Sequence, residues 1–571
     1  MNKRLGIIVL LLSSLTLAAC RDADRESPVS GTEFVSEYLS PARIVLERGA
    51  VSEGACLLRE YRGQVSTSEP VAARFSKGGS ILLDFGKEIQ GGIQIVRSMS
   101  GSHAPALFRL CLGESVSEAM SDVREPGSTA TNDHSVRDFD ISVPWLGVAE
   151  YGNSGFRFAR LDYLGDEEIG LVTVRAISKY RDIPYLGSFE CPDERLNQIW
   201  KTGAYTVHLN MQEYLWDGIK RDRLVWIGDM HPEVMTVGTV FGNHEVVRKS
   251  LDYVRDNTDP TVWMNGICSY SLWWIIIHHH LYTWYGDLEY LREQKVYMSQ
   301  LLENVLSNVN GSREAYGEGR FIDWPSNDQP DVIHAGLQAL TVRALEAGSE
   351  ISGLLGDADL ENRCAETAAE MRKYVPDHVG NSQAAALLAI EGMMDAGEAS
   401  KIILANGPEK FTSFMGYYLL EALAKGGHYA EAMDLISKYW GRMLDLGATT
   451  FWEDFNYKDG ENAARIDEIV PEGKFDIHAD GGAWCYVGLR HSFCHGWASG
   501  PTTWLSRHVL GIEPVGVGFR QVRIEPHLGD LQWASGTFPT PYGVISVRHE
   551  KKADGTVSSD IRLPKGVKLV K

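Results

Sequence analysis

The longest uniform feature of the sequence is a region of helical periodicity from about residue 190 to about residue 512. In "SFMGYYLLEALAKGGHYAEAMDLISKYWGRML" (413–444), apolar residues recur at helical spacing on both sides of Gly426 and Gly427, which predicts a helical hairpin. Comparable segments occur at 333–355, 361–374 and 383–395. A region of this length holds roughly a dozen helices of ordinary size. A closed double ring of six helical hairpins fits that number.

The flanks of this region have strand patterns. In "GSILLDFGKEIQGGIQIVRS" (79–98), two strand-like runs surround a Gly-Gly pair that we interpret as a turn, and "GFRFARLDYLG" and "GLVTVRAIS" continue the pattern. After residue 515, "GVISVRHE" and "VSSDIRLP" return to strands. The predicted organisation is therefore an N-terminal β-sandwich (34–187), a helical barrel (188–515) and a small C-terminal β-domain (516–571).

The first 33 residues have the pattern of an export signal and a tether. "MNKRLGIIVLLLSSLTLAAC" has a basic start and then an apolar run too short to span a bilayer, followed by small residues before Cys20. The "LAAC" ending resembles the bacterial lipoprotein box, which implies that 1–20 is removed as a signal peptide and that Cys20 carries lipid. Residues 21–33 are polar and acidic, as in a tether. We expect an exported protein held by lipid at the outer membrane, facing the periplasm or the cell surface.

Charge and cysteine usage exclude several classes of function. The formal net charge of −21 argues against nucleic acid as a general partner. After Cys20, seven cysteines are scattered without a CxxC pair, which is neither a disulfide framework nor a zinc site, so we expect most of them to be buried as small apolar groups. The run His278–His280 lacks the i, i+4 spacing of a helical metal pair. We therefore predict no metal and no cofactor, and the sequence does not predict an oligomeric state.

Four stretches place tryptophan beside a carboxylate or a histidine, with small residues nearby. Aromatic faces stack on sugar rings, while carboxylates bind hydroxyls or transfer protons, so the combination favours glycoside hydrolysis with a carbohydrate as partner. The stretches are "DGIKRDRLVWIGD" (217–229), "FIDWPSND" (321–328), "GATTFWEDFNY" (447–457) and "SFCHGWASGPTTWL" (492–505).

The same stretches resemble glycoside hydrolase family 78, the α-L-rhamnosidases, over most of the chain from about residue 80. "LLDFGKEIQGGIQI" and "FRFARLDYLG" are similar to two β-domain motifs of that family, and "RLVWIGD" is similar to its R-L-G-W-x-G-D. "GATTFWE" and "SFCHGWASGPTTWLSRHVLGIEP" are similar to its G-A-T-T-x-W-E and to its S-x-x-H stretch with a G-I-x-P ending. The resemblance implies an (α/α)6 barrel flanked by β-domains and an inverting exo-α-L-rhamnosidase.

The resemblance also implies roles for individual residues. Glu453 falls on the family's catalytic base, and Asp222 falls on its acid, where the family has a glutamate. The family's upstream D-C-P-Q-R-D is replaced by "DGIKR", one residue shorter, so Asp217 matches its aspartate only across a gap and is the second candidate for the acid. The remaining residues expected to bind substrate are Asp217, Arg223, Trp226, Asp229, Asp323, Trp324, Trp452 and His495.

Three functions stay open at this point. The first is an exo-α-L-rhamnosidase on plant or microbial glycans, the second is a glycosidase of other specificity on the same barrel, and the third is a surface lipoprotein that binds glycans without turnover. Lys220, Arg221 and Arg223 crowd the expected acid, and a bidentate arginine suits a carboxylate. These cations predict a preference for rhamnose attached to a uronic acid.

Overall fold

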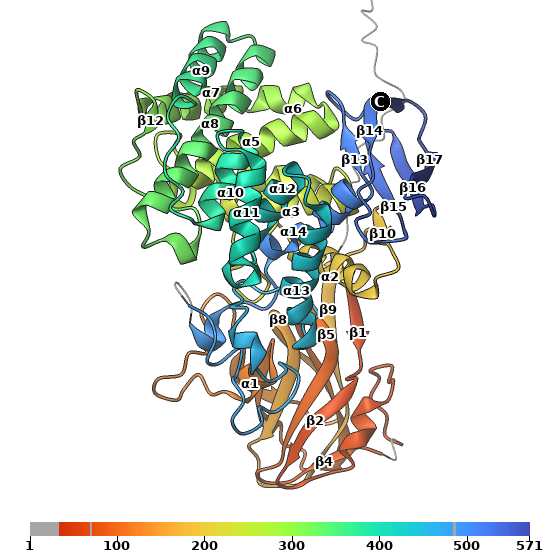
Figure 1. The fold of residues 1–571 in the computed structure, drawn as a ribbon. Helices are drawn as coiled ribbons and strands as arrows, with labels where there is room; N and C mark the ends of the chain where they lie inside the picture. Colours follow the sequence, from red (N-terminus) through yellow and green to blue (C-terminus); the bar gives the residue numbers. More distant parts are fainter. Residues whose placement is uncertain (1–33, 69–70, 484–486, 571) are drawn as a thin grey trace, which may run out of the picture.

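A computed structural model describes residues 34–68, 71–483 and 487–570. The predicted signal peptide and tether, with Cys20, lie outside these residues, as does Cys485. Figure 1 shows a β-domain at one end, a helical barrel in the middle and a second, smaller β-domain beside the barrel. This architecture confirms the fold class that the sequence predicts.

The N-terminal region is one branched antiparallel sheet of nine strands around a single apolar core, rather than two separate sheets. Strand β5 pairs with β2 through its first residues and with β9 through its last. One long strand therefore joins two parts of the sheet. The strands are β1 Phe34–Leu39, β2 Arg43–Arg48, β3 Val51–Ser52, β4 Ala73–Phe75, β5 Ser80–Gly101, β6 Ala106–Gly113, β7 Asp138–Val143, β8 Val148–Tyr163 and β9 Ile169–Arg181.

The Gly91–Gly92 pair corrects one expectation from the sequence. Instead of turning the chain, it lies within β5, at a point where the register with β8 shifts. A Cβ at Gly91 would lie 1.9 Å from the carbonyl oxygen of Ile177 on β9. The two glycines therefore allow a bulge and a close approach of backbones, which a sequence pattern does not distinguish from a turn.

The helices of the middle region form a double ring. Among the described residues, α3, α5, α8, α10, α12 and α14 contact one another in that order, and α14 returns to α3. The inner helices α3, α5 and α10 are buried almost all round, whereas the outer helix α4 buries one face, as a two-layer ring requires. The helices are α2 Glu194–Asn210, α3 Ile227–Val240, α4 Glu245–Asp256, α5 Cys268–Tyr285, α6 Leu288–Glu293, α7 Lys295–Ser307, α8 Pro330–Leu354, α9 Ala358–Met371, α10 Ser382–Ile390, α11 Ala396–Asn406, α12 Gly416–Lys425, α13 Tyr429–Asp445 and α14 Gly500–Trp504.

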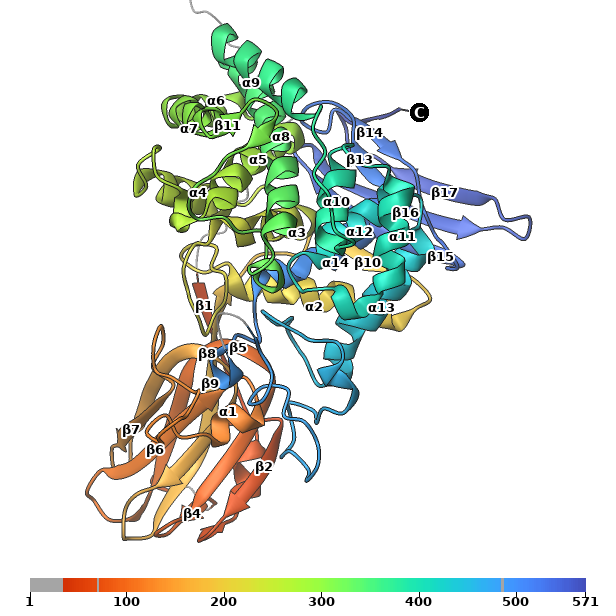
Figure 2. The same ribbon diagram turned by 60° about the vertical axis from the view of Figure 1, so that its left-hand side comes forward.

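The C-terminal domain is built from two small sheets packed beside the barrel (Figure 2). Strand β10 (Ser188–Glu190), which was expected to open the barrel, pairs with β15 of this domain instead. The strands that follow the barrel are β13 Ile512–Pro514, β14 Gln521–Ile524, β15 Trp533–Thr540, β16 Gly543–Lys551, β17 Val557–Arg562 and β18 Lys568–Val570. Two further elements lie elsewhere: the hairpin β11 Val309–Asn310 with β12 Arg313–Glu314 inside the helical region, and the short helix α1 Val116–Met120 beside the N-terminal sheet.

Two further findings concern membrane spans and cysteines among the described residues. No helix within the described residues has the length and apolarity needed to cross a membrane. The six described cysteines after the signal region are buried free thiols, as expected: Cys56, Cys111, Cys191, Cys268, Cys364 and Cys494.

Candidate active site

The loop between α2 and α3 is folded around Asp217. Its carboxylate accepts the backbone N–H of Asp222 at 2.7 Å and that of Leu224 at 3.0 Å, so both oxygens fix the loop. Burial raises the pKa of Asp217 to about 7, against these two amides, which favour the charged form. A pKa near neutrality would suit a general acid. Both oxygens of Asp217 are already bonded to backbone amides, however, so its carboxyl group serves to hold the loop.

Asp222 is buried and surrounded by donors. The Arg221 guanidinium pairs with its Oδ1, and the indole N–H of Trp226 donates to its Oδ2 at 3.1 Å. The imidazole Nε2 of His134, from the loop between β6 and β7, lies 3.3 Å from Oδ1. A role of Asp222 as proton donor therefore requires these partners to leave a proton on its carboxyl group available to substrate.

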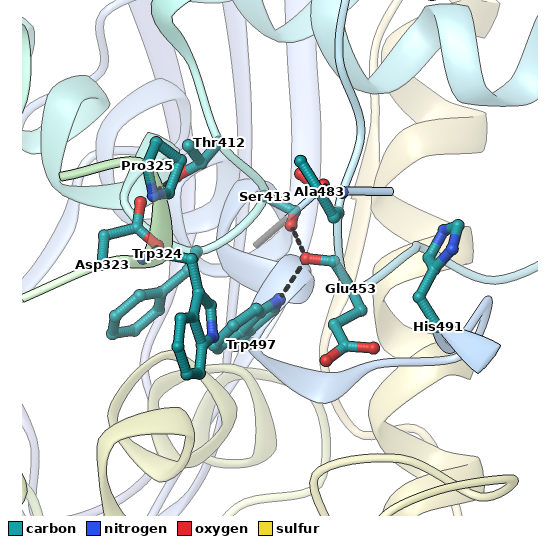
Figure 3. Close-up of a pocket in the computed structure, with 11 residues that line it drawn as sticks. Asp323, Trp324, Pro325, Thr412, Ser413, Glu453, Ala483, His491 and Trp497 are labelled. Carbon is teal, nitrogen blue, oxygen red and sulfur yellow. Dashed lines mark hydrogen bonds between the residues drawn. The ribbon is translucent and has the colours of Figure 1, made fainter. Parts of the chain in front are cut away.

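Glu453 follows α13 and is fixed through its backbone and its side chain. Its N–H donates to the Ser492 carbonyl, and the Ser492 N–H donates to Oε2, each at 2.9 Å. Its carbonyl accepts bonds from Ser413 Oγ and from Trp497 Nε1 (Figure 3). Burial alone would raise the pKa of Glu453, but Arg221, His495 and the Ser492 amide outweigh it and lower the pKa. Glu453 is thus a carboxylate at neutral pH, as a base must be.

One guanidinium connects the two carboxyl groups. Arg221 pairs with Asp222, and its Nη1 lies 3.4 Å from Glu453 Oε2, a contact between residues 232 positions apart in the sequence. Because a guanidinium is only a few ångströms wide, the nearest oxygens of Asp222 and Glu453 are at most roughly 9 Å apart, a limit compatible with the separation in inverting glycosidases. The closing of the helical ring therefore brings both candidates to one place.

Asp229 and His495 form a second buried pair next to Glu453. Asp229 lies in the first turn of α3, and its Oδ2 is 3.1 Å from His495 Nε2, while the Tyr270 hydroxyl contacts Oδ1 at 3.3 Å. Burial raises the pKa of Asp229. Burial lowers the pKa of His495, but Glu453, Asp229 and Asp217 outweigh it and bring that pKa to about 9. At neutral pH His495 is therefore a cation among carboxylates, suited to orient them.

Of the other expected residues, Trp226 and Trp324 are half-buried at the site, whereas Trp452 is not part of the cavity wall. Trp452 is 1 % exposed and stacks on Phe493, with a distance of 4.3 Å between ring centroids. Because its ring packs in the core, the structure does not support the expected contact of Trp452 with substrate. A tryptophan next to a candidate base in sequence can thus be a core residue.

Asp323 and Trp324 line a cavity together with Glu453 (Figure 3). Asp323 accepts bonds from Thr412 Oγ1 at 2.8 Å and from Gln383 Nε2 at 2.7 Å, and burial raises its pKa to about 7. The cavity has a volume of about 20 Å³, which is room for about one water molecule. Its wall consists of Asp323, Trp324, Pro325, Thr412, Ser413, Phe414, Glu453, Asp454, Ala483, His491 and Trp497.

The three cations near the expected acid have protein partners. Lys220 is buried and lies 3.1 Å from both Glu114 and Glu118, and Arg221 is buried between Asp222 and Glu453. Arg223 is half-buried, lies over the Trp216 ring at 4.6 Å and donates to the Asn153 carbonyl at 2.7 Å. Lys220 and Arg221 are therefore not placed to meet a carboxylate of the substrate.

One group among the described residues has the geometry of a metal site: Glu114, Glu118 and His478. The ammonium of Lys220 already pairs with both glutamates. Both ring nitrogens of His478 are also engaged, with Ser115 Oγ at 2.7 Å and with the His491 carbonyl at 3.2 Å. The cluster therefore fits a lysine cation, and its donor set is not free for a metal ion.

Sequence reasoning missed several residues of the site. Arg221 was expected as a cation beside Asp222 but not as its link to Glu453, and Ser413 and His134 were given no role in the site. Trp497 and Ser492 lie within the quoted stretch 492–505 but carried no assigned role. The small-polar composition of that stretch was the one signal that could have indicated backbone contacts to Glu453.

Comparison with known proteins places the site in a family. The profile of the bacterial alpha-L-rhamnosidase six-hairpin glycosidase domain matches residues 184–509, and that of the bacterial alpha-L-rhamnosidase C-terminal domain matches 511–570. An alpha-L-rhamnosidase of Streptomyces avermitilis is 24% identical over 94% of this chain and 50% of its own length. The chain thus spans about half the length of that relative.

Solved structures share the fold. The GH78 family rhamnosidase of Bacillus sp. GL1 superposes with a TM-score of 0.69 at 22% identity, covering 86% of this chain and 52% of that one. A rhamnosidase from Klebsiella oxytoca with rhamnose bound gives 0.66 at 19% identity, covering 85% of this chain and 97% of that one. The six-hairpin glycosidase profile matches residues 184–509, which is more than half of the chain and includes Asp222, Glu453 and His495. This chain therefore belongs to the bacterial α-L-rhamnosidase six-hairpin glycosidase family.

Proposed function

We propose that this protein is an inverting exo-α-L-rhamnosidase that removes terminal rhamnose from plant or microbial glycans. The observation that carries the proposal is the Arg221 bridge, which holds Asp222 and Glu453 across one site while the pKa of Glu453 is lowered. Single-displacement hydrolysis of a glycoside uses two carboxyl groups at one site, one as the acid and one as the base. Membership of the family and relatives described as rhamnosidases support rhamnose as the sugar that is released.

Each candidate residue has one step in this reaction. Asp222 donates a proton to the glycosidic oxygen, so that the leaving group departs as an alcohol. Glu453 removes a proton from a water molecule as that water attacks the anomeric carbon. Asp229 and His495 bind the sugar hydroxyls and orient Glu453, and Trp226 and Trp324 contact the ring faces.

The test is turnover of an aryl α-L-rhamnoside followed by proton NMR. We expect release of rhamnose whose first-formed anomer is the β form, since a single displacement inverts the configuration. A first-formed α anomer would contradict the inverting mechanism while leaving the substrate class intact. Turnover of other aryl glycosides but not of the rhamnoside would show a glycosidase of other specificity.

A glycan-binding protein without turnover is the alternative from another class. It is favoured by the local structure at Asp222, which is one methylene shorter than the family's glutamate and already pairs with Arg221. Binding of rhamnosides by calorimetry without release of sugar from any substrate would establish this alternative.

The preference for a uronic acid beside the rhamnose now depends on Arg223, because Lys220 and Arg221 are occupied. Arg223 is half-buried, and its charge lies in the same loop as Asp222. The measurement is kcat/KM for a glucuronide-linked rhamnoside and for its carboxyl-reduced form, with wild type and Arg223→Gln. Equal values for the two substrates in the wild type would exclude the preference.

Export with a lipid on Cys20 is also part of the proposed function, since it places the enzyme outside the cytoplasm with its substrates. Metabolic labelling with a radioactive fatty acid should mark the wild type and not Cys20→Ala. Labelling that survives the substitution would reject the anchor, and protease treatment of intact cells distinguishes the surface from the periplasm.

A further inference from the structure

Residues 129–137 form one of the loops through which the N-terminal β-domain reaches the active site. Thr129 Oγ1 accepts the Leu489 N–H at 3.0 Å, Asp133 pairs with Arg490, and Ser135 Oγ donates to the Lys220 carbonyl at 3.0 Å. Between Asp133 and Ser135, His134 adopts a left-handed backbone conformation with φ 62°. The loop is thus fixed against both barrel segments that flank the site, and His134 is the residue that it presents to Asp222.

Arg221, Trp226 and His134, which contact the Asp222 side chain, differ in what they can do with a proton. The guanidinium of Arg221 keeps its protons, and the indole of Trp226 is only a donor. The imidazole of His134 can both donate and accept a proton. It lies 3.3 Å from Asp222 Oδ1, and its side chain is 26% exposed while that of Asp222 is 6% exposed. His134 therefore connects a buried carboxyl group with solvent.

We propose that His134 is a positioning residue that holds Asp222 and returns a proton to it after each turnover. The proposal rests on the function proposed above. After catalysis Asp222 has given its proton to the leaving group and Glu453 has gained one from water. To reset the site, Glu453 releases its proton to solvent, and Asp222 takes one from the His134 imidazolium, which is reprotonated by solvent. The other charged groups facing this contact are Arg221, and Asp133 at 3.8 Å from His134, itself paired with Arg490.

The test compares His134→Ala and His134→Gln with His103→Ala, which changes an exposed histidine of the same domain whose ring contacts Trp145. We expect His134→Ala to lose about tenfold in kcat on a poor leaving group, with added imidazole restoring part of it. His134→Gln retains a neutral donor, so KM should stay near that of wild type while kcat falls. His103→Ala should be unaffected. Wild-type kcat and pH profile in both His134 variants, or failure of imidazole to restore kcat, would overturn the proposal.

A second readout does not need turnover. Because His134 Nε2 lies 3.3 Å from Asp222 Oδ1, the NMR signals of the His134 ring should shift in Asp222→Asn. Unchanged ring signals would reject the contact itself. Absence of wild-type activity on every α-L-rhamnoside, together with shifted ring signals, would reject the rhamnosidase function and leave the contact standing.

A different observation points to a second binding site. A cavity of about 450 Å³ adjoins the one beside Glu453, and the two share Pro325, Thr412, Asp454 and Ala483. Its size is that of a small-molecule site. Five side-chain amides line it, and each bonds to the protein through one end. Gln329 and Asn406 donate their NH2 groups to backbone carbonyls, and Gln383 donates its NH2 group to the Asp323 carboxylate. Asn381 and Asn456 instead accept backbone N–H groups.

The other end of each amide has no protein partner within the described residues, which leaves three acceptors and two donors. Sugar hydroxyls both donate and accept, so this mixed set suits them. Among the described lining residues Lys410 is the one cation, beside Glu409 and Asp454, so the wall does not select an anion. We infer that this cavity binds a neutral saccharide unit of the glycan that carries the rhamnose, an inference that also rests on the proposed function.

The test uses Asn381→Asp/Asn456→Asp, which keeps both oxygens that accept backbone N–H groups and removes both free donors. KM for a neutral rhamnosyl oligosaccharide should rise roughly tenfold, while kcat/KM for a small aryl rhamnoside stays within about twofold. Gln329→Ala should act in the same direction, and Gln532→Ala, a surface amide of the C-terminal domain that also donates to a carbonyl, should have no effect. Equal effects on both substrates, or none, would reject the site. No turnover of either by wild type would reject the rhamnosidase function instead, and calorimetry with the oligosaccharide then decides the site.

Discussion

Asp222 and Glu453 share one guanidinium, yet different parts of the molecule hold them. The backbone of Glu453 is fixed by Ser492, Ser413 and Trp497, all from the barrel. Asp222 lies in a loop folded around Asp217 and meets His134 from the β-domain. The comparison teaches that residues of the barrel hold Glu453 in place, whereas the β-domain contributes a contact to Asp222.

The largest expected effect concerns the base. Glu453→Gln should lower kcat by about 10²–10⁴-fold, the range for loss of a general base, with little change in KM. Steady-state kinetics on an aryl α-L-rhamnoside measures it. Glu461→Gln, an exposed glutamate of the same loop region, is the control. Wild-type kcat in Glu453→Gln would show that the base has been misassigned.

The acid should show the same loss only where the leaving group needs a proton. Asp222→Asn should lower kcat by about 10²–10⁴-fold on an alkyl rhamnoside and by much less on a nitrophenyl rhamnoside. Asp217→Asn should affect both substrates alike, because Asp217 holds the loop through two backbone amides. If Asp217→Asn shows the leaving-group dependence and Asp222→Asn does not, the two roles are reversed.

The shared guanidinium gives a prediction on pH. Arg221→Gln removes the strongest of the influences that lower the pKa of Glu453, so that pKa should rise. Since Glu453 must be a carboxylate, the acid limb of kcat/KM should move to higher pH, with a loss of up to about 10²-fold from misplaced groups. Arg221→Lys keeps the charge and should move the limb less. An unmoved limb in Arg221→Gln would separate Arg221 from the base.

A smaller effect distinguishes the two tryptophans. Trp324→Phe should raise KM several-fold with little change in Tm, because Trp324 lines the cavity. Trp452→Phe should leave KM unchanged and destabilise the fold by roughly 1–3 kcal/mol, as expected for a truncation in a packed core. Thermal unfolding and steady-state kinetics on both variants check this. A raised KM in Trp452→Phe would place its ring at the substrate after all.

The smallest effect is on stability. Burial raises the pKa of Asp323 and of Asp217 to about 7 in the folded protein, well above the value in an unfolded chain. Their favourable contribution is complete below about pH 4 and is lost as the pH rises through 7, at about 1.4 kcal/mol per pH unit for each proton released. Tm should therefore fall between about pH 4 and pH 7, and Asp323→Asn should reduce the slope. A slope equal to that of wild type would contradict the raised pKa.

The sequence predicted the helical region well, because hydrophobic periodicity is a local property. The break at Gly426–Gly427 separates α12 from α13 as expected. The Gly91–Gly92 pair was wrongly interpreted as a turn, since a bulge depends on the neighbouring strands β8 and β9. The same limit explains Trp452, whose ring direction depends on Phe493, about 40 residues away in the chain.

By itself, the sequence determined the order of the three domains, the hairpin pattern of the ring, and Glu453 and Asp222 as the carboxyl groups to consider. Only the tertiary structure decided that Arg221 joins them, that Asp217 serves the loop, and that His134 of the β-domain contacts the acid. The physical reason is range. Periodicity and motifs report on residues within one or two turns of each other. The protonation of a buried carboxyl group instead depends on charges and donors that folding brings from more than 80 positions away in the chain.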